Sequence, residues 1–130
     1  MSAVKTAVVG VGYLGRFHAQ KYAAHPDCEL IGVVDTDADR AAQVADELGC
    51  EAFTDPAHIT NRVDAISLAS PTRLHFALAK PLLSAGVHCL IEKPITTTVA
   101  EADALIELAH AANVVLQVGH LERFNPAMVA

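Results

Sequence analysis

The sequence predicts an α/β fold in which a doubly wound, six-stranded parallel sheet carries helices on both faces. Three observations lead to this prediction. Short β-branched runs alternate with helical patterns, the runs are continuously apolar, and a glycine-rich motif directly follows the first run. Continuous apolar runs are typical of parallel strands buried on both faces. Right-handed helical crossovers then favour the strand order 3-2-1-4-5-6.

Six short runs are the predicted strands. In chain order they are residues 7–9, 30–34, 51–53, 65–69, 87–91 and 114–118, of which 51–53 is the weakest. Val and Ile recur in most of them, and strands favour such β-branched side chains.

The segments between the strands have the spacing of amphipathic helices. A first helix opens after the glycine motif. The second has Asp37 as its predicted N-cap, Gly49 as its stop, and an apolar face at i, i+3, i+4 and i+7 formed by Ala41, Val44, Ala45 and Leu48. A third ends near Gly86, and a fourth begins at the capping box formed by Thr98 and Glu101.

The composition argues against several classes of protein. With 130 residues the chain has the length of one domain. Its net charge of -6, with scattered basic residues, argues against a nucleic-acid surface and a polybasic membrane patch. Three Cys without C-x-x-C spacing and seven dispersed His predict neither a disulfide framework nor a metal site. No apolar run reaches membrane-spanning length, so a reducing cytoplasm is the expected location.

The glycine motif predicts a phosphate-binding loop. Gly10, Gly12 and Gly15 form the pattern G-x-G-x-x-G between the first strand and the first helix. The first glycine allows a tight turn, the second lets the backbone approach a pyrophosphate, and the third lets helix and strand pack closely. Tyr13 and Leu14, inside the motif, are expected to contact the same ligand. The helix N-terminus adds free N–H groups for an anion.

Asp35 ends the second strand, twenty residues after the last glycine of the motif. A carboxylate at this spacing binds the ribose diol of NAD and repels a 2′-phosphate. NAD is therefore the predicted cofactor, although Arg40 leaves NADP open as an alternative. The competing interpretation is an ordinary strand-end turn with a capping aspartate.

The other candidate residues follow the fourth and fifth strands. Because the carboxyl ends of parallel strands share one edge, these residues should lie with the glycine loop and Asp35. The predicted members of the cofactor site at this edge are Ala69, Ser70, Pro71, Glu92 and Lys93. The alternative is that Ser70 merely caps a helix and that Glu92 and Lys93 form a surface turn.

Two histidines near this edge are ambiguous. His75 lies one helical turn after the fourth strand, where it could contact the cofactor or be an ordinary exposed helix residue. His18 lies on the first helix and is expected to pack or to support the site rather than to touch a ligand.

Taken together, the segments GVGYLGRFHA, SPTxxH, EKP and GHLERFNP resemble the Gfo/Idh/MocA family of NAD(P)-dependent oxidoreductases, over essentially all 130 residues. The resemblance implies a Rossmann fold in which Lys93 is the active-site lysine, next to the nicotinamide and the substrate hydroxyl. It implies that Glu92 approaches the nicotinamide ribose and that Pro94 often follows a cis peptide bond.

The segment GHLERFNP looks like family members that oxidise the 3-position of UDP-N-acetyl-hexosamines. That resemblance would place His120, Arg123 and Asn125 near a sugar or nucleotide-sugar substrate; a polar linker is the alternative. The family also has a second domain, which supplies most substrate contacts and the oligomer interface. We therefore expect an NAD(P)-binding domain at 1–118, the start of a linker at 119–130, and a homo-oligomeric full-length protein.

The resemblance leaves two classes of function open. In the first, the chain is the cofactor domain of a sugar-type dehydrogenase, binding NAD but turning over little by itself. In the second, it is a non-catalytic NAD-sensing regulatory module. Lys93 discriminates between them, because a sensor does not need a catalytic lysine.

Overall fold

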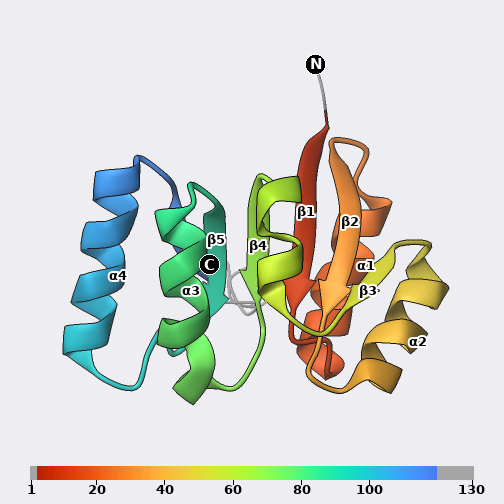
Figure 1. The fold of residues 1–130 in the computed structure, drawn as a ribbon, viewed down its shortest axis with the longest axis horizontal. Coiled ribbons are helices and arrows are strands. Elements are labelled where there is room, and N and C mark those ends of the chain that lie inside the picture. The colour runs from red at the N-terminus through yellow and green to blue at the C-terminus, as the bar shows by residue number, and fades with distance from the viewer. Residues whose placement is uncertain (1–2, 120–130) are drawn as a thin grey trace, which may run out of the picture.

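Six parallel strands form one sheet with the order β3-β2-β1-β4-β5-β6, as predicted. The computed structural model describes residues 3–119. The strands are β1 (Val4–Val9), β2 (Cys28–Val34), β3 (Glu51–Phe53), β4 (Ala65–Leu68), β5 (His88–Glu92) and β6 (Leu116–Gly119) (Figure 1). The sequence therefore identified every strand, including the short β3.

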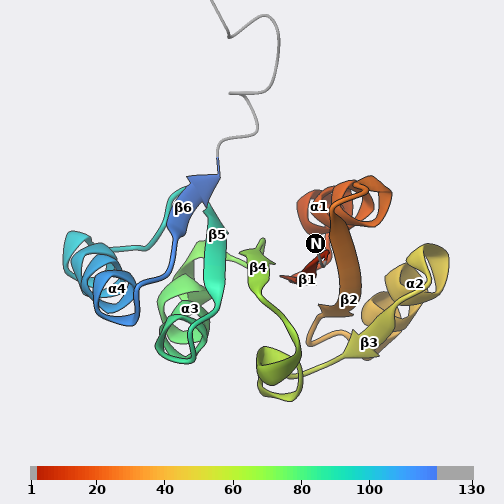
Figure 2. The ribbon, with the colours of Figure 1, turned by 90° about the horizontal axis from the view of Figure 1, so that it is seen from above.

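Helices connect the strands. They are α1 (Tyr13–Ala24), α2 (Ala38–Leu48), α3 (His75–Ser84) and α4 (Val99–Ala112), with short 3-10 turns at Pro56–His58, Thr60–Arg62 and Thr72–Leu74. Figure 2 shows α1 and α2 beside the β1–β2–β3 half of the sheet, and α3 and α4 beside the β4–β5–β6 half. Within residues 3–119, no helix has both the length and the apolar character needed to cross a membrane.

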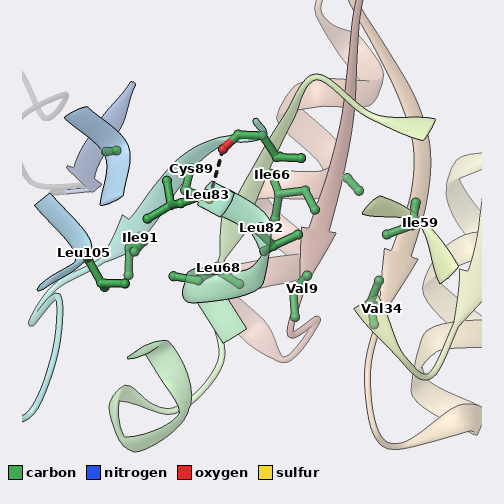
Figure 3. Close-up of a cluster of buried hydrophobic side chains, with 14 residues drawn as sticks. Val9, Val34, Ile59, Ile66, Leu68, Leu82, Leu83, Cys89, Ile91 and Leu105 are labelled. Carbon is green, nitrogen blue, oxygen red and sulfur yellow. Dashed lines mark hydrogen bonds between the residues drawn. The ribbon is translucent and has the colours of Figure 1, made fainter. Parts of the chain in front are cut away.

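Two buried clusters, one on each face, hold the layers together. Val8 and Val33 contribute to the smaller cluster with residues of α1 and α2. Their strand neighbours Val9 and Val34 join the larger cluster, which includes residues of α3 and α4 (Figure 3). Successive strand residues thus face opposite cores, which explains the continuously apolar runs. Burying one Val, Leu or Ile side chain in these clusters contributes about 1.5–3 kcal/mol to the stability of the fold.

Capping residues mark the starts of α2 and α4 and the end of α2, where the sequence predicts them. Asp37 Oδ1 accepts a hydrogen bond from the Arg40 N–H at 3.1 Å, and Gly49 ends α2 in the left-handed conformation, with φ of 71°. Thr98 Oγ1 accepts from the Glu101 N–H at 3.1 Å. The Glu101 carboxylate accepts from the Thr97 hydroxyl at 2.8 Å, so it reaches back to the residue before the cap.

Most strands differ from the predicted ranges by a few residues. β1 and β2 begin earlier than predicted, at Val4 and Cys28, and β4 ends one residue earlier. β6 begins at Leu116 instead of residue 114, because the Val114 N–H donates to Ala109 O and completes the end of α4. It runs to Gly119, one residue beyond the expected domain boundary. β5 includes Glu92, which pairs in register with Gly119. This extension fixes the backbone of a predicted site residue inside the sheet.

Candidate functional site

The glycine loop between β1 and α1 is packed against the end of β4. Gly10 has a φ of +89°, and a Cβ there would lie 2.7 Å from Ser70 N. A Cβ on Gly15 would lie 1.6 Å from Gly10 O. Both positions therefore require glycine, the first for backbone conformation and close approach, the second for close approach alone. The loop and the start of α1 form one tightly packed unit.

Gly12 differs from these two glycines because the space beside it is open. A Cβ on Gly12 would meet no atom of the described chain within 4 Å. Gly12 is the N-cap residue of α1, and no side-chain cap bonds the first N–H groups of that helix. These groups are therefore directed at space that a pyrophosphate can fill.

The Asp35 carboxylate is buried and held by two backbone N–H groups. Its Oδ2 accepts from Val11 N at 2.9 Å, and its Oδ1 accepts from Asp37 N at 2.9 Å. Arg40 Nη1 lies 3.8 Å from Oδ2. Each carboxylate oxygen keeps a further lone pair for a ligand hydroxyl. The carboxylate is thus fixed in position and can still accept hydrogen bonds from a ribose.

A cavity of about 510 Å³ connects the glycine loop to Asp35. Its lining comes from the carboxyl ends of β1, β2 and β4, from the segment after β3, and from the start of α3. The lining residues are Val9, Gly10, Gly12, Val34, Asp35, Thr36, Arg40, Thr54, Pro56, Ala69, Ser70, Pro71, Arg73, Leu74 and Leu78. A volume of this size, mostly apolar with a few polar groups, is typical of a small-molecule site.

Ser70 contributes an unusual polar group to this cavity. Among residues 3–119, its Oγ is a buried side-chain oxygen with no hydrogen-bond partner. Such a group is costly to leave without a partner in the interior, and a ligand that bonds to it removes the cost.

His75 is buried beneath the site, with an exposed fraction of 1%. Its Nε2 lies 2.8 Å from Ser70 O, and its Nδ1 lies 3.2 Å from Pro94 O and 3.1 Å from Ile95 O. The alternative of an ordinary exposed helix residue is therefore wrong for His75, because its ring is covered and faces backbone carbonyls; the cofactor contact stays a prediction. His75 instead connects the segment after β4 to the segment after β5.

Glu92 and Lys93 end β5 at the same edge. Glu92 is 8% exposed, and its Oε1 lies 2.6 Å from Nε2 of His18 on α1. Lys93 is exposed, and its backbone N–H donates to Gly119 O at 3.4 Å. The Lys93–Pro94 peptide bond is cis, as the resemblance implied. These residues thus present a buried carboxylate and an exposed lysine at the β5 side of the glycine loop.

Residues 4–120 match the family described as oxidoreductase family, NAD-binding Rossmann fold, which is the Gfo/Idh/MocA family. The chain belongs to this family. The match confirms the predicted fold and the predicted cofactor, NAD, for the domain as a whole.

Relatives of this family share both sequence and fold with the chain. UDP-N-acetylglucosamine 3-dehydrogenase of Acidithiobacillus ferrooxidans is 52% identical over 128 residues. The solved structure of that enzyme superimposes with a TM-score of 0.92, and the match covers 99% of this chain and 42% of the other. The scyllo-inositol 2-dehydrogenase (NAD(+)) of Bacillus subtilis is 35% identical over 128 residues. GenD2 from gentamicin A biosynthesis, solved in complex with NAD, superimposes with a TM-score of 0.88 at 30% identity, covering 92% of this chain and 35% of the other.

The chain spans 40% of the length of the Acidithiobacillus enzyme and 37% of the length of the Bacillus enzyme. The matches cover 98% and 95% of this chain, respectively. The family relationship therefore concerns the NAD-binding part of these relatives.

The structure brings most of the predicted site residues to one edge of the sheet. Ala69 and Pro71 line the cavity with Ser70, and Leu14 lies half-buried in the first turn of α1. Tyr13, at the start of α1, is 94% exposed, so the described chain does not fix its side chain against the cavity. The predicted substrate residues His120, Arg123 and Asn125 lie outside the described residues.

Sequence reasoning missed part of the cavity lining and one side-chain contact. Thr54 and Pro56 line the cavity because they follow β3, whose carboxyl end lies at the same edge as those of the other strands. Applying the strand-end rule to the weak third strand would have found them. The sequence offered no signal for the partnership of His18 and Glu92, which lie 74 positions apart.

The described residues fit an NAD molecule in three independent ways. Gly12 leaves open space at an uncapped helix start, Asp35 offers a fixed carboxylate for a ribose, and Ser70 offers a buried hydroxyl that lacks a partner. The fit spans the β2 and β4 sides of the glycine loop, which is where dinucleotides cross the sheet.

Proposed function

We propose that this chain is the cofactor-binding part of an NAD-dependent dehydrogenase that oxidises a secondary alcohol of a sugar or nucleotide sugar. The 52% identity to a UDP-N-acetylglucosamine 3-dehydrogenase favours UDP-N-acetylglucosamine as the substrate and its 3-hydroxyl as the reacting group. The inositol dehydrogenase relative supports the wider class of polyhydroxylated ring substrates.

The placement of Lys93 is the observation that carries this proposal. Lys93 directly follows β5, at the same edge as the glycine loop, and its side chain is exposed. A lysine that serves only as a solvated charge can stand anywhere on the surface. At this edge, it is positioned to meet a hydroxyl group brought beside the cofactor and to accept or polarise its proton.

The other predicted residues would hold the cofactor. Gly12 and the N–H groups at the start of α1 would take the pyrophosphate, and Asp35 would accept hydrogen bonds from the adenosine ribose. Ser70 would bond to the cofactor through its buried hydroxyl, and Glu92 would approach the nicotinamide ribose. Bound NAD⁺ would supply the acceptor for the hydride that leaves the alcohol carbon.

The same proposal covers the organisation of the whole protein. The NAD-binding domain would end with β6 at Gly119, and the residues after it would begin the connection to a substrate-binding domain. His120, Arg123 and Asn125 would lie near the sugar. The complete protein would work in the cytoplasm as a homo-oligomer.

The Lys93→Ala substitution tests the proposal in the longest protein that the gene encodes. UDP-N-acetylglucosamine is the substrate, and NADH formation and the dissociation constant of NAD⁺ are both measured. We expect turnover to fall by about 10²–10⁴-fold, the range for loss of a general base, with the NAD⁺ dissociation constant changed by less than about threefold. Lys80→Ala on α3 is the control, because Lys80 lies on a helix away from this edge.

The NAD-sensing alternative makes the opposite prediction. If the wild-type protein binds NAD⁺ but reduces it with no sugar or nucleotide sugar, and Lys93→Ala changes nothing, the chain serves regulation instead of catalysis. If Lys93→Ala abolishes NAD⁺ binding, the assignment of Lys93 as the proton acceptor is wrong.

A further inference from the structure

His18 and Glu92 form a buried polar pair between two elements of the candidate site. The distance from His18 Nε2 to Glu92 Oε1 is 2.6 Å, and each residue is 8% exposed. The histidine donates from Nε2, since an ionised carboxylate can only accept. A hydrogen bond this short between a ring nitrogen and a carboxylate is of the strong, charge-assisted kind.

The backbone of each partner is fixed. Glu92 is the last residue of β5 and pairs in register with Gly119 of β6. A Cβ on Gly119 would lie 3.0 Å from Glu92 Oε1, so glycine at this position leaves room for the carboxylate. His18 lies on α1, whose first turn packs on the glycine loop through Gly15.

The pair lies on the opposite side of the glycine loop from Asp35. Asp35 follows β2, on one side of β1, whereas Glu92 belongs to β5, beyond β4 on the other side. A dinucleotide that crosses the sheet edge with its adenosine ribose at Asp35 has its nicotinamide half on the β4–β5 side. The described lining of the large cavity contains Asp35 but neither His18 nor Glu92.

We propose that His18 is a positioning residue that fixes the Glu92 carboxylate for the nicotinamide half of NAD. This inference rests on the proposed function, because it requires NAD to cross the edge in that direction. His18 acts through Glu92 and touches no reacting atom. By linking α1 to the end of β5, the pair also sets the distance between the pyrophosphate loop and Lys93.

A structural role alone would have different consequences. If the pair only stabilised the fold, its loss would weaken binding of every part of the cofactor equally. A positioning role restricts the loss to ligands that reach the β5 side. ADP and NADH separate the two cases, because ADP keeps the adenosine and the diphosphate but lacks the nicotinamide nucleoside.

The test compares His18→Leu, His18→Gln and Glu92→Gln in this chain. Leucine removes the donor, whereas glutamine can place an amide N–H near the position of Nε2. We expect His18→Leu to weaken NADH binding by about tenfold while ADP binding changes by less than about twofold, and His18→Gln to restore most of the NADH affinity. His110→Leu on α4 is the matched control, since His110 is exposed and outside the site.

A double-mutant cycle tests separately whether the two side chains interact, which the positioning role requires. Combining His18→Leu with Glu92→Gln should reveal a coupling of about fivefold or more in the unfolding equilibrium constant. NADH binding by His18→Leu at the wild-type affinity, equal losses of NADH and ADP, or absence of coupling would each overturn the positioning role alone. A wild-type chain that binds neither NADH nor ADP would overturn the proposed function and this inference with it.

Discussion

The Asp35 carboxylate accepts a hydrogen bond from the Val11 backbone N–H at 2.9 Å, which ties the end of β2 to the glycine loop. The residue expected to recognise the cofactor ribose therefore also holds the loop expected to bind its pyrophosphate. A change at Asp35 should affect cofactor choice and loop order together.

Asp35→Asn should weaken NAD⁺ binding by about tenfold, because a neutral amide is a poorer acceptor for the ribose hydroxyls. Discrimination against NADP⁺ should decrease in the same variant, since the negative charge that repels a 2′-phosphate is gone and Arg40 lies nearby. Calorimetric titration with NAD⁺ and with NADP⁺ measures both affinities and their ratio. Asp39→Asn, in the first turn of α2, is the control. Unchanged selectivity in Asp35→Asn would contradict the role given to the carboxylate.

Gly12→Ala should leave the fold intact and damage cofactor binding. Its φ of -67° suits any residue, and an added Cβ meets no described atom, so the free energy of unfolding should change by less than about 0.5 kcal/mol. The methyl group would occupy the space expected for the pyrophosphate and should weaken NAD⁺ binding by roughly tenfold or more.

Gly10→Ala, in contrast, should destabilise the fold itself. Its φ of +89° and the 2.7 Å approach to Ser70 N should cost about 1–3 kcal/mol of stability. Chemical denaturation and NADH titration of both variants separate the two effects. Equal losses of stability in Gly12→Ala and Gly10→Ala would contradict the inference that the space beside Gly12 is open.

His75→Leu should destabilise the domain by about 1–3 kcal/mol, because it replaces the buried imidazole, and its N–H donor, by an apolar side chain among three backbone carbonyls. The leucine also separates two segments of the site, so NAD⁺ affinity should fall with stability. Urea denaturation measures the change, and His110→Leu, on the exposed surface of α4, should stay within about 0.5 kcal/mol of the wild type. If His75→Leu is as stable as the wild type but binds NAD⁺ more weakly, the result would support a direct contact between His75 and the cofactor.

Cys89 should resist alkylation in the native chain. Burial raises the pKa of its thiol to about 12, and the thiolate is the reactive form. At pH 8, below that pKa, native Cys89 should stay unmodified by iodoacetamide, and it should become reactive once the chain unfolds and its pKa returns to about 8.5. Peptide mass spectrometry before and after denaturation checks this. Rapid native labelling would show that β5 opens to solvent.

The sequence by itself determined the fold and the edge at which the site lies. Its information was local: β-branched runs, caps such as Asp37 and Thr98, and three glycines at fixed spacing. Parallel topology then placed the strand ends together, since right-handed crossovers leave few other arrangements. Lys93 and Asp35 could be assigned to one edge on that reasoning, without knowledge of any distance.

Only the tertiary structure decided which side chains contact one another. His75 follows a site segment in the sequence, but packing turned its ring towards the carbonyls of Ser70 and Ile95. His18 and Glu92, 74 positions apart, meet because α1 and β5 pack across the sheet edge. Pattern and spacing depend on neighbours along the chain, whereas a buried donor takes whichever acceptor the packed core brings to it.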